Sequence, residues 1–142
     1  LDGEGPLMIL RDILKLASSA LGAQSTRIRV ISENIANSDS VYSDGKTPYR
    51  RKVTTFEAVF DRKAAIENVR VRQINRDLSD PVRRYEPSHP RADAAGYVQY
   101  PNVQPLIEMA DLRDAERSYR ANVQVVETAK RLFRNALDIM RA

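Results

Sequence analysis

Apolar and small residues recur in steps of three and four through the first part of the chain, and this spacing predicts a long amphipathic helix. The main stripe runs from Leu14 to Ile35 with one polar interruption, at Gln24. A second row beside it makes the early part of this helix apolar over more surface than one neighbouring element covers. The main stripe is Leu14, Ala17, Leu21, Gln24, Ile28, Ile31 and Ile35, and the second row is Ile9, Ile13, Leu16, Ala20 and Ala23.

The C-terminal segment after Pro105 repeats this design over a greater length. No glycine or proline occurs between Leu106 and Ala142, so the simplest interpretation is one helix of roughly 35 residues, about 50 Å long. A periodic segment longer than about 25 residues is typical of a coiled coil or a repeat assembly. Its main stripe is Met109, Leu112, Tyr119, Val123, Val126, Phe133, Leu137 and Met140, widened by Ala115, Val125, Ala129, Leu132, Ala136 and Ile139.

The segment between the two helices has a different pattern. The alternation in "YRRKVTTFEAVF" from Tyr49 and in "ENVRVRQINR" from Glu67 predicts two exposed strands, and "GYVQYPNV" from Gly96 predicts a third extended piece. Prolines punctuate the stretch between the last two, which we interpret as a long ordered loop.

These patterns predict an α+β fold, in which long N- and C-terminal helices pack as a coiled-coil-like inner domain beside a small β-rich middle domain. The expected N-terminal helix occupies residues 8–40, the middle domain and its loop residues 41–104, and the C-terminal helix residues 105–142. Residues 1–7, "LDGEGPL", are interpreted as a cloning remnant or a flexible tail.

Composition limits the kinds of protein that this chain can be. With 142 residues, 42% hydrophobic and 30% charged, it has the size and balance of one folded domain. The absence of cysteine excludes disulfides, thiolate nucleophiles and cysteine-ligated metals. The apolar stretch "LMILRDILKL" contains three charged residues, so we expect neither a signal peptide nor a membrane span.

The net charge of +4 raises the alternative of a nucleic-acid-binding module. The basic excess lies in residues 41–104, and its densest run is Arg50-Arg51-Lys52. Because this run lies within an alternating segment, half of its side chains point to solvent on a strand. We therefore favour a solvated strand face over a phosphate-binding patch.

Candidate catalytic residues are few. His89 is the only histidine and lies between prolines, so a histidine pair for a metal is excluded. Asp80, Glu86 and Asp93 are close together in the chain, but carboxylates in a proline-rich loop more often make turns and caps. No glycine-rich phosphate loop is present. We predict a protein that is not an enzyme and has no cofactor or metal.

The polar stretch "NIANSDS", residues 34–40, follows the apolar stripe directly. Its short side chains bond backbone groups, and asparagine tolerates left-handed geometry, so together they end a helix while satisfying its terminal carbonyls. Ile35 and Ala36 continue the packed side. We predict a rigid helix exit that fits against a neighbouring subunit.

Three segments resemble known sequences. Residues 18–40, "SSALGAQSTRIRVISENIANSDS", resemble the N-terminal signature of the flagellar rod, hook and filament-cap-junction family of axial proteins. Residues 107–132 resemble the matching C-terminal signature, and residues 85–103, "YEPSHPRADAAGYVQYPNV", are similar to a stretch of one member found in the proximal rod. The C-terminal signature matches at Met109, Ala115, Arg117, Tyr119, Ala121, Asn122 and Val123.

The resemblance implies a structural subunit of the bacterial flagellar basal body. Its helices lie in the inner tube of the axial structure, it assembles helically with itself and other rod proteins, and it transmits torque. The resemblance also implies export by the flagellar type III apparatus without a cleaved signal, and a place in the periplasm-spanning rod. No binding of nucleic acid and no membrane insertion is expected. The alternative is a soluble helical adaptor that forms a closed coiled-coil oligomer.

The predicted subunit contacts follow the stripes and the helix exit. Glu33, two residues from Ile31, falls on the opposite side of the same helix and is expected to be less buried. The predicted interface residues are Leu21, Ile28, Ile31, Ile35, Asn34, Asn37, Met109, Tyr119, Asn122, Val123, Val126, Phe133, Leu137 and Met140.

Overall fold

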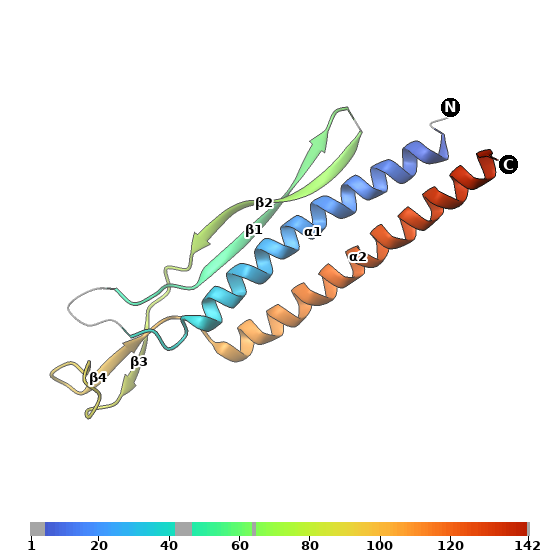
Figure 1. The fold of residues 1–142 in the computed structure, drawn as a ribbon. Helices are drawn as coiled ribbons and strands as arrows, with labels where there is room; N and C mark the ends of the chain where they lie inside the picture. The colour runs from blue at the N-terminus through green and yellow to red at the C-terminus, as the bar shows by residue number, and fades with distance from the viewer. Residues whose placement is uncertain (1–4, 42–46, 64, 142) are drawn as a thin grey trace. The chain divides into compact units, whose positions relative to one another are not determined.

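The computed structural model describes residues 5–41, 47–63 and 65–141. Two long helices enclose, in chain order, four strands that form two separate two-stranded sheets, β1–β2 and β3–β4 (Figure 1). The predicted α+β class is confirmed. The elements are α1 (Pro6–Ala36), β1 (Lys52–Asp61), β2 (Ile66–Arg76), β3 (Val82–Tyr85), β4 (Tyr97–Tyr100) and α2 (Pro105–Arg141).

Both helices begin at a proline. Pro6 and Pro105 suit the first helical position because a proline lacks the N–H that would have no partner there, and its fixed φ already matches the helix. In α2 the carbonyl of Gln104 accepts the N–H groups of Ile107 and Glu108, both at 3.1 Å. The expected tail of residues 1–7 overlaps α1 at Pro6, and residues 1–4 lie outside the described residues.

Strand β3 lies inside the stretch that the sequence pattern predicted to be loop, so that assignment was wrong for residues 82–85. It pairs antiparallel with β4, Val82 opposite Tyr100 and Tyr85 opposite Tyr97. The strand has four residues, all exposed, which is too short for an alternating pattern to identify. Gly96 has φ +83°, and a Cβ there would lie 2.9 Å from the Tyr85 ring, so this turn requires glycine.

The chain folds as two compact units, and each takes residues from both helices and from the β1–β2 hairpin. The first unit consists of Leu1–Arg27, Phe56–Arg72 and Asp114–Ala142, and the second of Ile28–Thr55 and Gln73–Arg113. Among the described residues, neither helix contains an apolar run long enough to cross a membrane.

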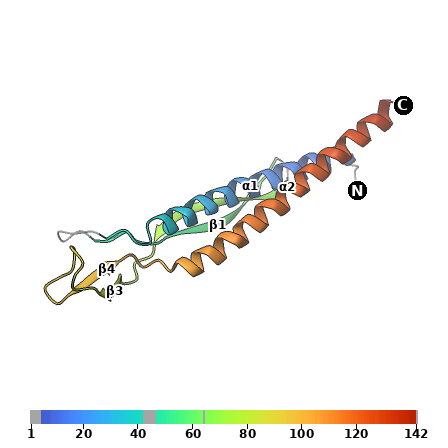
Figure 2. The same ribbon diagram turned by 60° about the horizontal axis from the view of Figure 1, so that its bottom comes forward.

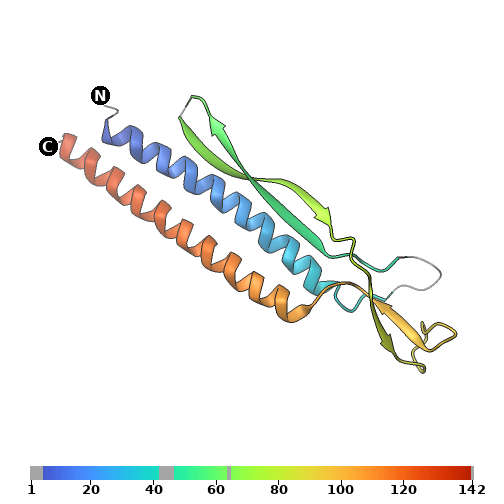
Figure 3. The same cartoon turned by 180° about the vertical axis from the view of Figure 1, so that it is seen from behind.

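In the first unit the α1 and α2 segments lie side by side and antiparallel, with the hairpin along α1 (Figures 2 and 3). The backbone N–H of Val69 in β2 donates to Ser19 Oγ at 3.3 Å, and Lys15 forms an ion pair with Asp61 of β1. The buried apolar residues of this unit are small, which lets the backbones of packed elements approach closely. They are Ala17, Ala23, Ala115 and Ala129.

The second unit has larger buried side chains. Its apolar core comes from the end of α1, from β4 and from the segment that follows β4. Two polar residues, Asn34 and Glu108, are buried with it. The apolar members are Val30, Ile31, Val98, Tyr100 and Val103.

Candidate assembly surfaces

The exit of α1 is capped as the sequence predicted. Asn37 donates twice to the carbonyl of Glu33, from its backbone N–H at 3.1 Å and from Nδ2 at 2.8 Å. Ser38 does the same to the carbonyl of Ile35, from its N–H at 3.2 Å and from Oγ at 2.8 Å. Carbonyls at the end of the helix thus find local partners, which is why α1 ends at Ala36.

Asn34 has a different role from the one predicted for it at the helix exit. Its side chain is wholly buried and makes four hydrogen bonds away from the cap. Oδ1 accepts from Tyr49 Oη at 2.8 Å and from the Lys52 N–H at 2.9 Å, while Nδ2 donates to the Lys52 carbonyl at 2.8 Å and to Glu108 Oε2 at 3.1 Å. Every hydrogen-bonding position of this amide is occupied.

Glu108 completes this buried group. Its carboxylate is wholly buried and also accepts a hydrogen bond from Arg51 Nε, and Arg51 Nη2 lies 3.5 Å from Asp111. We refer to Asn34, Tyr49, Arg51, Lys52 and Glu108 as the Asn34 cluster. Burial raises the pKa of the Tyr49 hydroxyl above its ordinary value, and nearby carboxylate charges add to the shift. The cluster joins the end of α1, the start of β1 and the first turn of α2.

The basic run Arg50-Arg51-Lys52 is not the solvated strand face that we predicted. Arg51 pairs with the buried Glu108, Lys52 Nζ lies 2.8 Å from Glu33, and Arg50 donates to the carbonyl of Ser79 at 3.1 Å. The prediction from alternating positions was wrong here because acidic residues on the two helices, Glu108 and Glu33, pair with Arg51 and Lys52. The run therefore stabilises the fold. The densest group of basic residues that could have bound nucleic acid is already engaged within the chain.

Glu33 is half-buried and lies between two cations. It pairs with Lys52 and, at 2.6 Å, with Arg29 one turn earlier on α1. The hydrogen bond from Lys52 is the main cause that lowers the pKa of Glu33 below its ordinary value. Lys52, at the start of β1, thus forms an ion pair with the side of α1 that faces away from the apolar stripe.

The predicted interface residues differ in burial within the single chain. Most are half-buried, and their role between subunits stays a prediction. Ile31 and Asn34 are buried. Leu21, Ile28, Ile35, Asn37, Asn122, Val123, Val126, Phe133 and Leu137 are half-buried, and Met109, Tyr119 and Met140 are exposed.

Sequence reasoning did not single out the most exposed apolar face of the first unit. It recognised these residues only as rows that widen the main stripes, whereas the structure turns several of them to solvent. On α1 they are Ile9, Ile13 and Leu16, and on α2 they are Val125, Leu132 and Ile139. The seven-residue spacing of the α2 members is the signal that could have identified a separate face.

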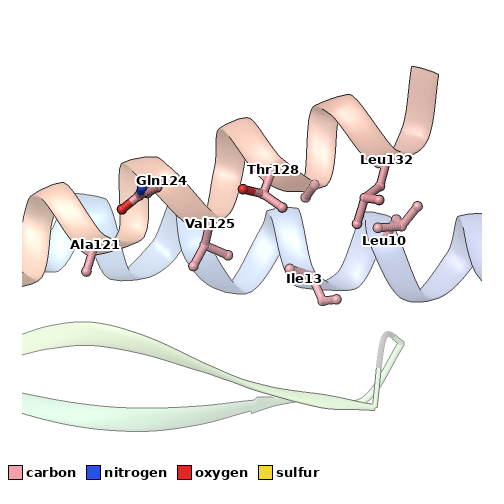
Figure 4. Close-up of a pocket in the computed structure, with 8 residues that line it drawn as sticks. Leu10, Ile13, Ala121, Gln124, Val125, Thr128 and Leu132 are labelled. Atoms are coloured by element: carbon pink, nitrogen blue, oxygen red, sulfur yellow. The ribbon is translucent and has the colours of Figure 1, made fainter. Parts of the chain in front are cut away.

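These rows border a groove of about 390 Å³ between α1 and α2 in the first unit, which we call the apolar groove (Figure 4). None of its lining residues is charged or titratable, so it suits an apolar side chain and offers no acid or base for catalysis. The lining residues are Leu10, Ile13, Ala121, Gln124, Val125, Thr128, Ala129 and Leu132.

Of the three loop carboxylates, Asp93 makes a turn, as predicted. Asp93 Oδ1 accepts the N–H groups of Ala95 and Tyr97, both at 2.9 Å, and the second of these bonds is the main cause that lowers the pKa of Asp93. Glu86 accepts from Tyr100 Oη at 3.0 Å, and His89 Nδ1 accepts the N–H of Arg91 at 3.1 Å. Within the part of the chain that the structure describes, no group of three or more potential ligands surrounds a metal position.

Two family profiles match segments near the two ends of this chain. Residues 14–41 match the profile of the family described as "Flagella basal body rod protein", and residues 94–139 match "Flagellar basal body rod FlgEFG protein C-terminal". The chain is 46% identical to the flagellar basal-body rod protein FlgC of Agrobacterium fabrum, over 90% of this chain and 93% of that protein. It is 40% identical to FlgC of Escherichia coli O6:H1, over 93% and 98%, and 39% identical to FlgC of Bacillus subtilis, over 89% and 95%.

Proposed function

The chain belongs to the FlgC family of flagellar basal-body rod proteins, and we propose that it assembles helically, with copies of itself and with other rod proteins, into the proximal part of the rod. It is a structural subunit of the basal body. In this proposal the packed helices of successive subunits form a tube that transmits torque.

The observation that carries the proposal is the exposed apolar surface of the first unit. Ile9, Leu132 and Ile139 are each about half or more exposed on helices that bury only alanines in their own unit. A large exposed apolar surface on a folded protein marks an interaction site. An open assembly covers such a surface with the next copy and leaves an equal surface free for further growth.

A closed coiled-coil oligomer is the second way to cover these faces. It differs from the rod subunit in stoichiometry, since a closed ring or bundle has a fixed number of chains. Sedimentation of the purified protein across a wide concentration range separates the two. A single defined oligomer that stays constant with concentration would contradict helical assembly.

The direct experiment is localisation in the source bacterium. We expect an epitope-tagged copy of the chain to co-purify with isolated basal bodies, and antibody labelling to mark the rod near its membrane end. Deletion of the gene should abolish motility, and the tagged copy should restore it. A tagged copy that restores motility but labels only the distal rod would contradict the proximal position.

We also propose export through the flagellar type III apparatus, with targeting information in the first 40 residues. A fusion of residues 8–40 to an easily unfolded reporter should be secreted in a flagellum-dependent manner. A matched fusion of residues 47–76 serves as the control. Secretion of the control fusion alone would contradict this part of the proposal.

A further inference from the structure

We propose that the β1–β2 hairpin of one copy docks in the apolar groove of a second copy, with Phe56 and Phe60 as the inserted side chains. The inference rests on the proposed function, because it specifies which two surfaces of the first unit meet between neighbouring subunits. Helical growth needs a contact between two different patches on the same chain. The groove is one patch, and the other must be sought on the remaining surface.

The groove fits aromatic occupants. A cavity of about 150 Å³ accepts one benzene ring, so the groove volume of about 390 Å³ has room for two. Its walls are uncharged along the stretch from Ala121 to Leu132, which spans about 16 Å at 1.5 Å per residue. An apolar occupant enters it without burying a charge.

The hairpin offers two matching rings. Phe56 and Phe60 occupy alternate positions of β1 together with Ala58, and all three are exposed, with Phe60 57% exposed. Residues at such positions share one face of a strand. Four residues of strand separate the rings by about 13 Å, which is shorter than the groove.

Few other surfaces of the first unit qualify. Among the described residues outside the rows that border the groove, the remaining large apolar residues that are exposed there are Met8, Phe56, Phe60, Tyr119 and Met140. Met8 and Met140 lie near opposite ends of the described chain, and the described residues one turn from Tyr119 on α2 include no second exposed large apolar side chain. Phe56 and Phe60 are the pair held on one continuous strand, and Ala58, the one position between them on that face, carries no charge.

The hairpin also needs a partner on this face. A two-stranded hairpin is at best marginally stable alone. One side of it is held to α1 by the bond between Val69 and Ser19 and by the ion pair between Lys15 and Asp61. The face that carries Phe60 is left exposed by the described residues, so docking on a second copy would complete its packing.

The expected contact is small. A buried aromatic side chain contributes roughly 150–250 Å², so two that are already partly covered bury a few hundred Å², below the roughly 1,200 Å² of a stable protein pair. One such contact is weak between free subunits and becomes effective when many form together in the rod. A subunit that must travel before it assembles benefits from this weakness.

Photo-crosslinking in assembled basal bodies tests the proposal. Phe60→benzoylphenylalanine keeps an aromatic side chain at the inserted position, and Glu127→benzoylphenylalanine, at an exposed α2 position outside the groove, is the matched control. We expect irradiation of the first variant to yield a product of two copies, joined between position 60 of one and residues 121–132 of the other. The control should give at least tenfold less crosslinked product between two copies of the chain.

The outcomes are separable from those of the proposed function. If the Phe60 variant is present in basal bodies but crosslinks only within its own chain, to a different protein or not at all, the docking proposal is overturned and the rod assignment stands. If the wild-type chain is absent from basal bodies, the proposed function itself fails. As a second readout, Phe60→Leu should retain motility and Phe60→Asp should lose it, and equal motility of the two would also overturn the docking.

Discussion

The two units of this chain are held together by different chemistry. The second unit buries an amide and a carboxylate, Asn34 and Glu108, and satisfies both with partners from three elements. Among its described apolar residues, the first unit buries only alanines and leaves leucine, isoleucine and phenylalanine side chains exposed. Buried polar groups tolerate one arrangement, because any other leaves a donor or acceptor unpaired. Exposed apolar faces instead accept a partner.

This difference between the two units suits a subunit that must both fold and assemble. The second unit holds the ends of both helices in a fixed relation to the start of β1 through its own side chains. The first unit leaves many of its large apolar residues exposed, and we propose that they make contacts between subunits. Substitutions in the second unit should therefore act on folding, and substitutions on the first unit should act on assembly.

The largest effect is expected from Asn34→Asp. The substitution is isosteric, but it replaces the Nδ2 donor with an oxygen that faces the Lys52 carbonyl and the Glu108 carboxylate. Two hydrogen bonds are lost and two buried carboxylates come together, which we expect to cost about 3–5 kcal/mol of the free energy of unfolding. Urea denaturation of the purified chain measures it.

The matched control is Asn122→Asp on α2. That amide is half-buried and donates only to the carbonyl of Ser118, one turn earlier. We expect a loss of about 1 kcal/mol or less. Equal losses in the two variants would show that the Asn34 cluster contributes no more than an ordinary helix-surface contact.

The next effect in size is expected from Ile31→Asp. Ile31 is 6% exposed in the second unit, so a carboxylate there is buried without a partner and should cost several kcal/mol. The variant should be unfolded or cleared in cells and absent from basal bodies. Val126→Asp, at a half-buried position of the first unit, should lose motility with a smaller loss of stability. If the Ile31→Asp variant unfolds at the same urea concentration as the wild type, substitutions in the second unit do not act mainly on folding, and the proposed difference between the units is wrong.

Much of this fold was predictable from sequence because its helices are long and strongly periodic. The three-four spacing placed both helices, and the cap at Asn37 and Ser38 followed from short polar side chains at the end of a stripe. Strand β3 was missed because four exposed residues carry no periodic signal. Domain limits and the interface role of the stripe residues stay predictions.

The Asn34 cluster was not predictable, for a physical reason. Its bonds join residues far apart in the chain: the residue numbers of Asn34 and Glu108 differ by 74, and those of Arg51 and Glu108 differ by 57. A local pattern reports amphipathicity, and on that scale Glu108 is an ordinary acidic residue in the first turn of a helix. Its burial depends on the approach of α1 and β1, which only the fold provides.

A smaller effect, dependent on pH, is expected from Glu33→Gln. Because the pKa of Glu33 in the folded chain lies below its ordinary value of 4.5, the ionised carboxylate stabilises the fold. This stabilisation is fully present above that ordinary value and is lost as the pH falls through the lower, folded-state pKa. At pH 7 we expect the variant to lose well under 1 kcal/mol of the free energy of unfolding, since the ion pairs with Lys52 and Arg29 are partly exposed.

The measurement for Glu33 is urea denaturation of wild type and variant at pH 7 and at a pH well below 4.5. The difference between the two proteins should shrink toward zero at the acidic pH, where the wild-type carboxylate is protonated. A difference that grows with acidification would contradict the ionised role of Glu33.

Another small effect on stability is expected from Leu132→Gln, and this variant separates folding from assembly most clearly. Leu132 is 49% exposed at the wall of the apolar groove, so an uncharged polar side chain of similar size should change the free energy of unfolding by no more than about 1 kcal/mol. The groove, however, would present an amide at the position where we propose that an apolar partner docks. Every copy in the rod would carry the same substitution. We expect a folded subunit that assembles poorly, with motility on soft agar strongly reduced and less of the chain in basal bodies. Lys130→Gln, two residues away and outside the groove, is the control and should keep normal motility. Full motility of the Leu132 variant would mean that the groove stays open to solvent in the rod, and the exposed apolar rows of the first unit would then need another explanation.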